Sequence, residues 1–156
     1  MPQGIVVLAG SLPVDNLELE LLVAEFGWLL KAARSPSGIA QLNLDHDVVT
    51  VFFSPRTMEL PWDQALRSVL KAAPRALPIL CHGFSERIPW TEATEAGAFH
   101  SLLMPFDAGE VRQSLGFVWG AKRRSTAIEM RRRPEPEAGN DDQAPAGRGR
   151  AAGFVA

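Results

Sequence analysis

The stretch that decides the fold is Ala96–Val111, which reads AGAFHSLLMPFDAGEV. It begins with small, turn-forming residues and continues into the apolar run Phe99–Leu103, which has the length of a buried strand. Asp107 and Glu110 then have the spacing of a capping box, in which an N-cap side chain accepts a hydrogen bond from the backbone N–H three residues later. The stretch therefore predicts a buried strand that leads directly into a helix.

The same alternation of strand and helix extends through the preceding sequence. Apolar runs of strand length predict strands over Ile5–Ala9, Trp28–Ala33, Asp47–Phe53 and Leu77–His82. Capping residues, prolines and 3.6-residue periodicity predict helices over Asp15–Gly27, Pro36–Leu44, Trp62–Ala73, Pro89–Gly97 and Asp107–Arg124. The helix over 62–73 has the clearest pattern, because its apolar residues recur on one face between two prolines.

Strands that alternate with helices at this spacing predict right-handed βαβ units. We therefore expect a flavodoxin-like α/β fold, a doubly wound (βα)5 arrangement with a five-stranded parallel sheet of order 2-1-3-4-5. With 156 residues, 46% of them hydrophobic, the chain has enough material for one sizeable core. We assign this single domain to residues 1–124.

The composition changes after this domain. From Ser125 onward Pro, Gly, Ala and charged residues dominate, so we predict a disordered tail over residues 125–156. Positions 1–120 carry eight basic and thirteen acidic residues, whereas positions 121–156 carry eight and five. Lys122, Arg123 and Arg124 are expected at the end of the last helix, where cations are favourable.

The sequence also restricts the cellular setting. It has no run of about 18 apolar residues that could span a bilayer, and its start lacks the positive region of a secretory signal. We therefore expect a cytoplasmic protein without a membrane partner. The single cysteine, Cys81, excludes an intramolecular disulfide and a multi-cysteine zinc site, and we expect a buried, inert thiol.

The Ala96–Val111 stretch, together with PILCHG at positions 78–83, resembles response-regulator receiver domains of the CheY-like superfamily. The resemblance covers roughly residues 4–122. It implies a role in two-component phosphorelay signal transduction. In that family an acidic pair after the first strand binds Mg²⁺, an aspartate at the end of the third strand accepts phosphate, a hydroxyl ends the fourth strand, and a lysine precedes the proline.

Each of these positions is substituted here. The resemblance places Gly10 and Ser11 at the acidic pair, Phe52 at the acceptor, Gly83 at the hydroxyl and Met104 at the lysine. Shifting the alignment by one residue puts Val51 at the acceptor, which also lacks a nucleophilic oxygen. A methionine thioether cannot neutralise an acyl phosphate. We predict a pseudo-receiver with no phosphoacceptor, no catalytic residues and no cofactor.

Other chemistry has little support. Mg²⁺ prefers hard oxygen ligands, which are missing at this site, so we expect the metal site to be lost. His46, His82 and His100 belong to different parts of the predicted fold, and we expect no metal site from them. The phosphate-binding pattern GxxxxGK[ST] is absent. The basic runs near the C-terminus are interrupted by acidic residues, so we do not expect nucleic-acid binding.

Two hypotheses about function follow. The first is a phosphorylation-independent signalling module that binds a protein partner, or a second copy as a homodimer, through Trp90, Phe99 and Ser101 on the face that receiver relatives use. Core packing is an equally good account of the nearby Trp119. The second is a small-molecule binding protein or enzyme that uses a crevice beyond four small residues and His82. Those four are Gly10, Ser11, Ser54 and Gly83.

Overall fold

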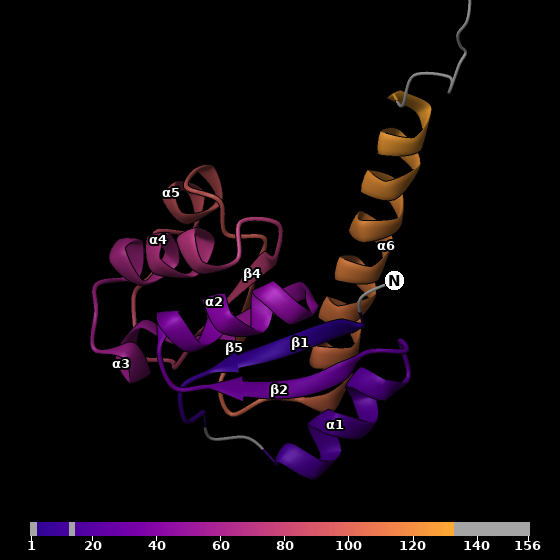
Figure 1. Cartoon of the computed structure of the whole chain (residues 1–156). Helices are drawn as coiled ribbons and strands as arrows, with labels where there is room; N and C mark the ends of the chain where they lie inside the picture. Colours follow the sequence, from indigo (N-terminus) through magenta and orange to yellow (C-terminus); the bar gives the residue numbers. More distant parts are fainter. Residues whose placement is uncertain (1–2, 13–14, 133–156) are drawn as a thin grey trace, which may run out of the picture. The chain divides into compact units, whose positions relative to one another are not determined.

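The computed structural model describes residues 3–12 and 15–132 of the chain. Its elements follow one another as β1 (Gly4–Ala9), α1 (Asn16–Ala24), β2 (Leu29–Ala33), α2 (Pro36–Asp45), β3 (Asp47–Phe53), α3 (Pro55–Met58), α4 (Trp62–Ala72), β4 (Leu77–His82), α5 (Trp90–Glu95), β5 (His100–Leu103) and α6 (Ala108–Arg132) (Figure 1). Every strand and helix that the sequence predicted is present, and the short α3 is an addition.

The strands form a five-stranded parallel sheet with the order β2-β1-β3-β4-β5. The predicted flavodoxin-like arrangement is therefore confirmed. β1 and β3 occupy the centre, and nearly all of their residues are buried, as expected for parallel strands covered on both faces. β5 is an edge strand that pairs with β4.

Two apolar clusters lie on the two faces of this sheet, because successive side chains of a strand point in opposite directions. Ile5 and Val7 of β1 belong to the first cluster, to which α2, α4 and α5 contribute. Val6 and Leu8 belong to the second, to which α1 and α6 contribute. Figure 1 shows the corresponding layers, with α2 and α4 on one side of the sheet and α1 on the other.

The predicted helix caps are present at both ends of the domain. Asp15 is the N-cap of α1, and its Oδ1 accepts hydrogen bonds from the backbone N–H groups of Leu17 at 3.0 Å and Glu18 at 3.2 Å. The predicted helix stop, Gly27, has a φ of 81°, which a glycine adopts without steric cost. At α6, Asp107 Oδ2 accepts from Glu110 N at 3.1 Å.

The last helix is longer than predicted. We expected it to end near Arg124, but α6 extends to Arg132, so residues 125–132 are helical rather than disordered. The reason is that glycine and proline are absent between Lys122 and Arg133, whereas Ala, Glu, Met and Arg favour helix. The remainder of the predicted tail, residues 133–156, lies outside the described residues.

The basic run that was expected to end this helix therefore lies within it. Lys122 is the last residue of the first of two compact units into which the chain divides, and the second begins at Arg123. Within the first unit, Lys122 Nζ donates a hydrogen bond to the backbone carbonyl of Arg75. This contact joins α6 to the loop before β4.

Candidate functional site

All positions that the receiver resemblance singles out lie at one edge of the sheet. Because the strands are parallel, their carboxyl ends meet there, and Gly10, Gly83 and Met104 each directly follow a strand. Phe52 precedes the last residue of β3. The two acids near this strand, Asp45 and Asp47, lie at its beginning, and Asp47 pairs with Gly4 at the opposite edge.

At the end of β1, the backbone leaves little room for a side chain. Gly10 has a φ of 89°, and its N–H donates to the carbonyl of Ala33 at 2.7 Å. A Cβ at position 10 would lie 2.9 Å from Thr57 Cγ2, which is too close for a real contact. An acidic residue could not replace Gly10 without a local rearrangement. Ser11 is exposed and lacks a carboxylate.

At the end of β3, an aromatic side chain occupies the acceptor position. Phe52 is completely buried between its strand neighbours Leu8 and Ile79. Its ring meets that of Phe106 edge to face, with centroids 6.1 Å apart and an interplanar angle of 88°. This geometry is favourable for two aromatic rings. Val51, the alternative acceptor position, is also completely buried.

Ser54 follows Phe53 and has a structural role that the sequence did not reveal. It is completely buried, and its Oγ accepts a hydrogen bond from Thr57 N at 3.3 Å, so that it caps α3. Its hydroxyl is therefore not available at the surface, contrary to the crevice hypothesis. The Ser-Pro pair that ends β3 is a sequence signal for such a cap, because proline is favoured in the first turn of a helix.

At the end of β4, a carboxylate binds the backbone. Gly83 N donates a hydrogen bond to Glu86 Oε2 at 2.8 Å, and the His82 ring Nδ1 lies 3.2 Å from the carbonyl oxygen of Gly83. The sequence analysis did not identify Glu86. A glutamate three residues after a glycine is a weak signal for a turn. The carboxylate fixes the loop at the position that the resemblance assigns to the family's hydroxyl.

At the end of β5, Met104 adds one more backbone hydrogen bond between β5 and β4. Its backbone N–H donates to the carbonyl of His82 at 2.8 Å, and its half-buried side chain packs against the second apolar cluster. The peptide bond to Pro105 is cis. The position of the family's lysine thus carries an uncharged side chain that contributes to the core.

Among the described residues, no three His, Cys, Asp or Glu side chains come together in a way that could hold a metal ion. His46 caps the end of α2, His82 ends β4, and His100 begins β5, where it packs edge to face on Phe117 with ring centroids 5.6 Å apart. The loss of the Mg²⁺ site stays a prediction that metal titration can test.

Cys81 lies inside β4 and is completely buried. Desolvation raises the pKa of its thiol well above the ordinary value; a hydrogen bond with the Phe53 backbone opposes this increase, and the charge of the nearby Glu86 adds a smaller increase. The thiol is therefore protonated at neutral pH. A protonated, buried thiol is a poor nucleophile, as the sequence predicted.

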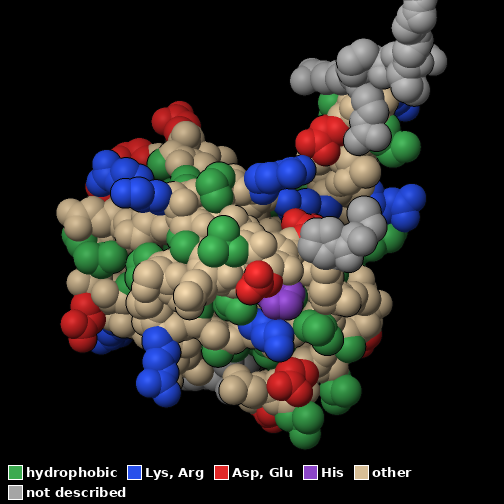
Figure 2. Space-filling view, viewed as in Figure 1, with side chains coloured by type: hydrophobic (Ala, Val, Ile, Leu, Met, Phe, Trp, Pro, Cys, Tyr) green, Lys and Arg blue, Asp and Glu red, His purple; other side chains and the backbone are tan. Residues whose placement is uncertain are grey.

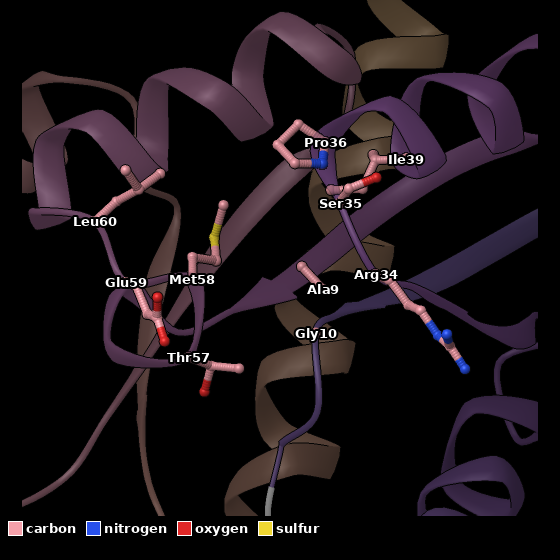
Figure 3. A pocket seen from close by; sticks show the side chains of 10 residues that line it. All are labelled: Ala9, Gly10, Arg34, Ser35, Pro36, Ile39, Thr57, Met58, Glu59 and Leu60. Atoms are coloured by element: carbon pink, nitrogen blue, oxygen red, sulfur yellow. The ribbon is translucent and has the colours of Figure 1, made fainter.

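Two adjacent hollows open beside this edge, around the ends of β1 and β2. One has a volume of about 210 Å³ and the other about 540 Å³. Gly10, Arg34 and Thr57 line both. Figure 3 shows the smaller hollow, with Arg34 and Glu59 on opposite sides of its opening. Of the four crevice residues proposed from the sequence, Gly10 and Ser11 line these hollows, whereas Ser54 and Gly83 do not.

The predicted partner residues lie in α5, in β5 and at the position directly before β5. Trp90 is 39% exposed, whereas Phe99 is half-buried and packs against the second apolar cluster. Ser101 is half-buried on the edge strand. Exposed aromatic residues that the sequence did not assign to this surface are Phe84 in the loop after β4 and Phe117 and Trp119 on α6. Trp119 is 42% exposed, so only part of its side chain is packed in the core.

None of the helices within residues 3–12 and 15–132 is both long and apolar enough to cross a membrane. On the face turned toward the viewer in Figure 2, apolar side chains form separate patches among charged side chains of both signs.

Comparison with known proteins gives a consistent result for the fold. No protein-family model matches the sequence, and no curated protein matches it. Among solved structures, a CheY-like response regulator receiver domain protein from Methanospirillum hungatei JF-1 is similar with a TM-score of 0.60 and 12% identity, over 80% of this chain and 99% of that one.

Two further structures agree. The signal receiver domain of an HD domain-containing protein from Pseudomonas fluorescens Pf-5 has a TM-score of 0.60 and 17% identity, over 81% of this chain and 94% of that one. An uncharacterized protein from Neptuniibacter caesariensis has a TM-score of 0.65 and 16% identity, over 85% of this chain and 96% of that one. The chain thus has the receiver fold that its sequence resembles.

Proposed function

We propose that this chain is an atypical receiver module of phosphorelay-type signalling that acts without phosphorylation, by binding another protein. In this proposal it has no catalytic residue and no metal. The observation that carries it is the burial of Phe52 at the acceptor position, in edge-to-face contact with Phe106. Aspartyl phosphate formation requires a carboxylate at that position.

The neighbouring positions support the same proposal. The close approach of Thr57 to Gly10 excludes a simple acidic replacement, and Met104 has no charge to attract a phosphoryl group. Burying Phe52 contributes about 1.5 to 3 kcal/mol to folding. An apolar side chain thus stabilises a single conformation where phosphorylated receivers have a switch.

The proposal is tested by titrating the full chain with acetyl phosphate, or with beryllofluoride, in the presence of Mg²⁺. Amide NMR shifts report binding, and intact mass reports phosphate transfer. A conventional receiver domain in parallel shows that the reagents are active. We expect no mass increase and no saturable shifts around Phe52, Gly83 and Met104. A phosphate adduct or saturable shifts at these residues would contradict the proposal.

For the partner surface, we propose that Trp90 is the main contact and that the half-buried Ser101 and Phe99 support it. The exposed aromatic rings of α5 and α6 favour this face, because aromatic residues are enriched at interface hot spots. Open backbone groups of the edge strand β5 add hydrogen-bonding capacity for a partner. A second copy of the chain is one candidate partner.

The surface is tested by comparing Trp90→Ala with Leu44→Ala. Leu44 is 83% exposed on α2 and serves as a matched control for removing an exposed apolar side chain. Sedimentation over a range of concentrations measures self-association, and quantitative affinity capture measures other partners. We expect Trp90→Ala to weaken binding and Leu44→Ala to leave it unchanged. Equal binding by both variants, with folding intact, would rule out this surface.

A further inference from the structure

We propose that the two hollows at the ends of β1 and β2 form one binding site for a small amphiphilic anion. The acidic group of the ligand would pair with Arg34, and its apolar part would lie against Ile39, Met58 and Leu60. This inference does not depend on the proposed signalling function. The lining residues include Gly10 and Ser11, which the resemblance assigns to the acidic pair, but none of Phe52, Gly83 or Met104, so the site lies beside the assigned acceptor position and does not contain it.

Small residues at the ends of β1 and β2 leave space on one side of the hollows. Gly10 has no side chain, and its positive φ turns the backbone away from the end of β1. Ala32, Ala33 and Ser11 add little volume along the neighbouring wall. Because Gly10, Arg34 and Thr57 line both hollows, a ligand can extend from one into the other past these residues. Together the hollows have the size of small-molecule sites, which is about 300 to 1,000 Å³.

The smaller hollow is suited to an apolar group. Ile39 is almost completely buried at its base, and Met58 and Leu60 are half-buried on the wall formed by α3 and the residues after it. In Figure 3, Met58 and Leu60 lie on the side opposite Ile39 and Ala9. Methionine adapts to ligands of different shape, because its side chain is unbranched and flexible.

The larger hollow is more polar and carries the charge that selects the ligand. Ser11, Asn16, Thr57 and Arg34 line it. Within the part of the chain that the structure describes, the Arg34 side chain has no hydrogen bond or ion pair. The guanidinium is therefore available for an external carboxylate or phosphate, which it can bind through two parallel hydrogen bonds. The adjoining start of α2 adds partial positive charge.

Glu59 sets the orientation of such a ligand. It follows α3 with a φ of 58°, and its N–H binds the carbonyls of Arg56 and Pro55. Its side chain lines the smaller hollow, across the opening from Arg34 (Figure 3). A carboxylate at this end repels an anion, whereas Arg34 attracts one at the other end. The acidic group of the ligand is therefore placed at Arg34.

The test uses three probes with the same eight-carbon chain: octanoate and octylammonium below their micelle-forming concentrations, and octanol below its solubility limit. Each is titrated into the full chain, and amide NMR shifts are followed. We expect octanoate to give saturable shifts at Gly10, Arg34, Ile39 and Thr57, and to bind more tightly than the other two. Equal affinity for the three probes, or no saturable shift with octanoate, would overturn the proposal.

Substitution of Arg34 tests the charge directly. We expect Arg34→Gln to weaken octanoate binding about tenfold, since a hydrogen bond to a charged group contributes on the order of one decade in affinity. Arg34→Glu should reverse the preference, so that octylammonium binds better than octanoate. Arg87→Gln, which removes an exposed arginine from the loop after β4, is the control and should change nothing. Unchanged selectivity in Arg34→Glu would refute the assigned role of Arg34.

Discussion

At the scale of single residues, the proposed independence from phosphorylation depends most on Phe52. Its side chain is completely buried, and its ring contacts Phe106 at the carboxyl edge of the sheet. Replacing Phe52 with a smaller, nucleophilic residue would leave a cavity, because the surrounding side chains relax only partly into the vacated space.

Replacing Phe52 with aspartate should therefore destabilise the protein without restoring phosphorylation. We expect Phe52→Asp to lower the free energy of unfolding by about 3 to 5 kcal/mol or more, since it combines a cavity with a buried carboxyl group. Urea denaturation measures this change, and mass spectrometry after acetyl phosphate treatment measures phosphorylation. Leu44→Asp, at a position 83% exposed, should alter stability by less than about 0.5 kcal/mol. A stable, phosphorylated Phe52→Asp would contradict our account of this site.

Cys81 provides a prediction about pH. Burial raises the pKa of its thiol above the ordinary value of 9.0, so above pH 9 the unfolded chain loses a proton that the folded chain keeps. Stability should then fall as pH rises, with a contribution of about 1.4 kcal/mol per pH unit from this one group. Urea denaturation between pH 8 and about pH 10.5 measures the slope.

The control for this prediction is Cys81→Ala, which lacks the thiol and should lose that part of the slope. Labelling of Cys81 by a thiol reagent gives a second measurement. We expect no labelling of the folded protein at neutral pH and rapid labelling in urea. Fast labelling without urea would show that the thiol is accessible.

At the scale of elements, most boundaries follow from local chemistry. Asp15 and Asp107 cap α1 and α6 as their spacing predicts, and β3 and β4 have the predicted bounds. The end of α6 differs, because its sequence from Ser125 to Arg132 favours helix although it offers little to bury. Composition alone therefore underestimated the length of this helix.

The cap at α6 should have a measurable energetic effect. Asp107 Oδ2 accepts a hydrogen bond from the backbone N–H of Glu110. N–H groups in the first turn of a helix have no partner within the helix. We expect Asp107→Ala to reduce the free energy of unfolding by about 0.5 to 2 kcal/mol. Asp45→Ala, at the end of α2, removes an acid of the same type that is not an N-cap. Equal losses in the two variants would show that the cap contributes nothing specific.

At the scale of the whole molecule, the sheet joins two apolar clusters that share no side chain. Leu66 of α4 is completely buried on one face, and Leu115 of α6 is completely buried on the other. Because the same strands form the floor of both clusters, loss of packing on either face should weaken the entire domain. The domain should unfold in a single cooperative transition.

We expect Leu66→Ala and Leu115→Ala each to cost about 2 to 5 kcal/mol. Tryptophan fluorescence and circular dichroism should report the same urea midpoint within each variant. The exposed Leu44→Ala should leave the midpoint nearly unchanged. Different midpoints from the two probes would show that the faces unfold separately.

The sequence by itself determined the order of strands and helices, because periodicity and turn residues are local properties of the chain, and their regular alternation indicated the flavodoxin-like strand order. The resemblance to receiver domains pointed to Gly10, Phe52, Gly83 and Met104, none of which has a carboxylate, hydroxyl or ammonium group. The site beside Arg34 was decided by the tertiary structure, since it requires Gly10, Arg34 and Thr57 from separate segments to meet. The tertiary structure also decided the role of Ser54, whose hydroxyl caps α3 by accepting a hydrogen bond from Thr57 N. A hollow depends on how side chains from different elements pack together, and a local sequence pattern contains no information about that packing.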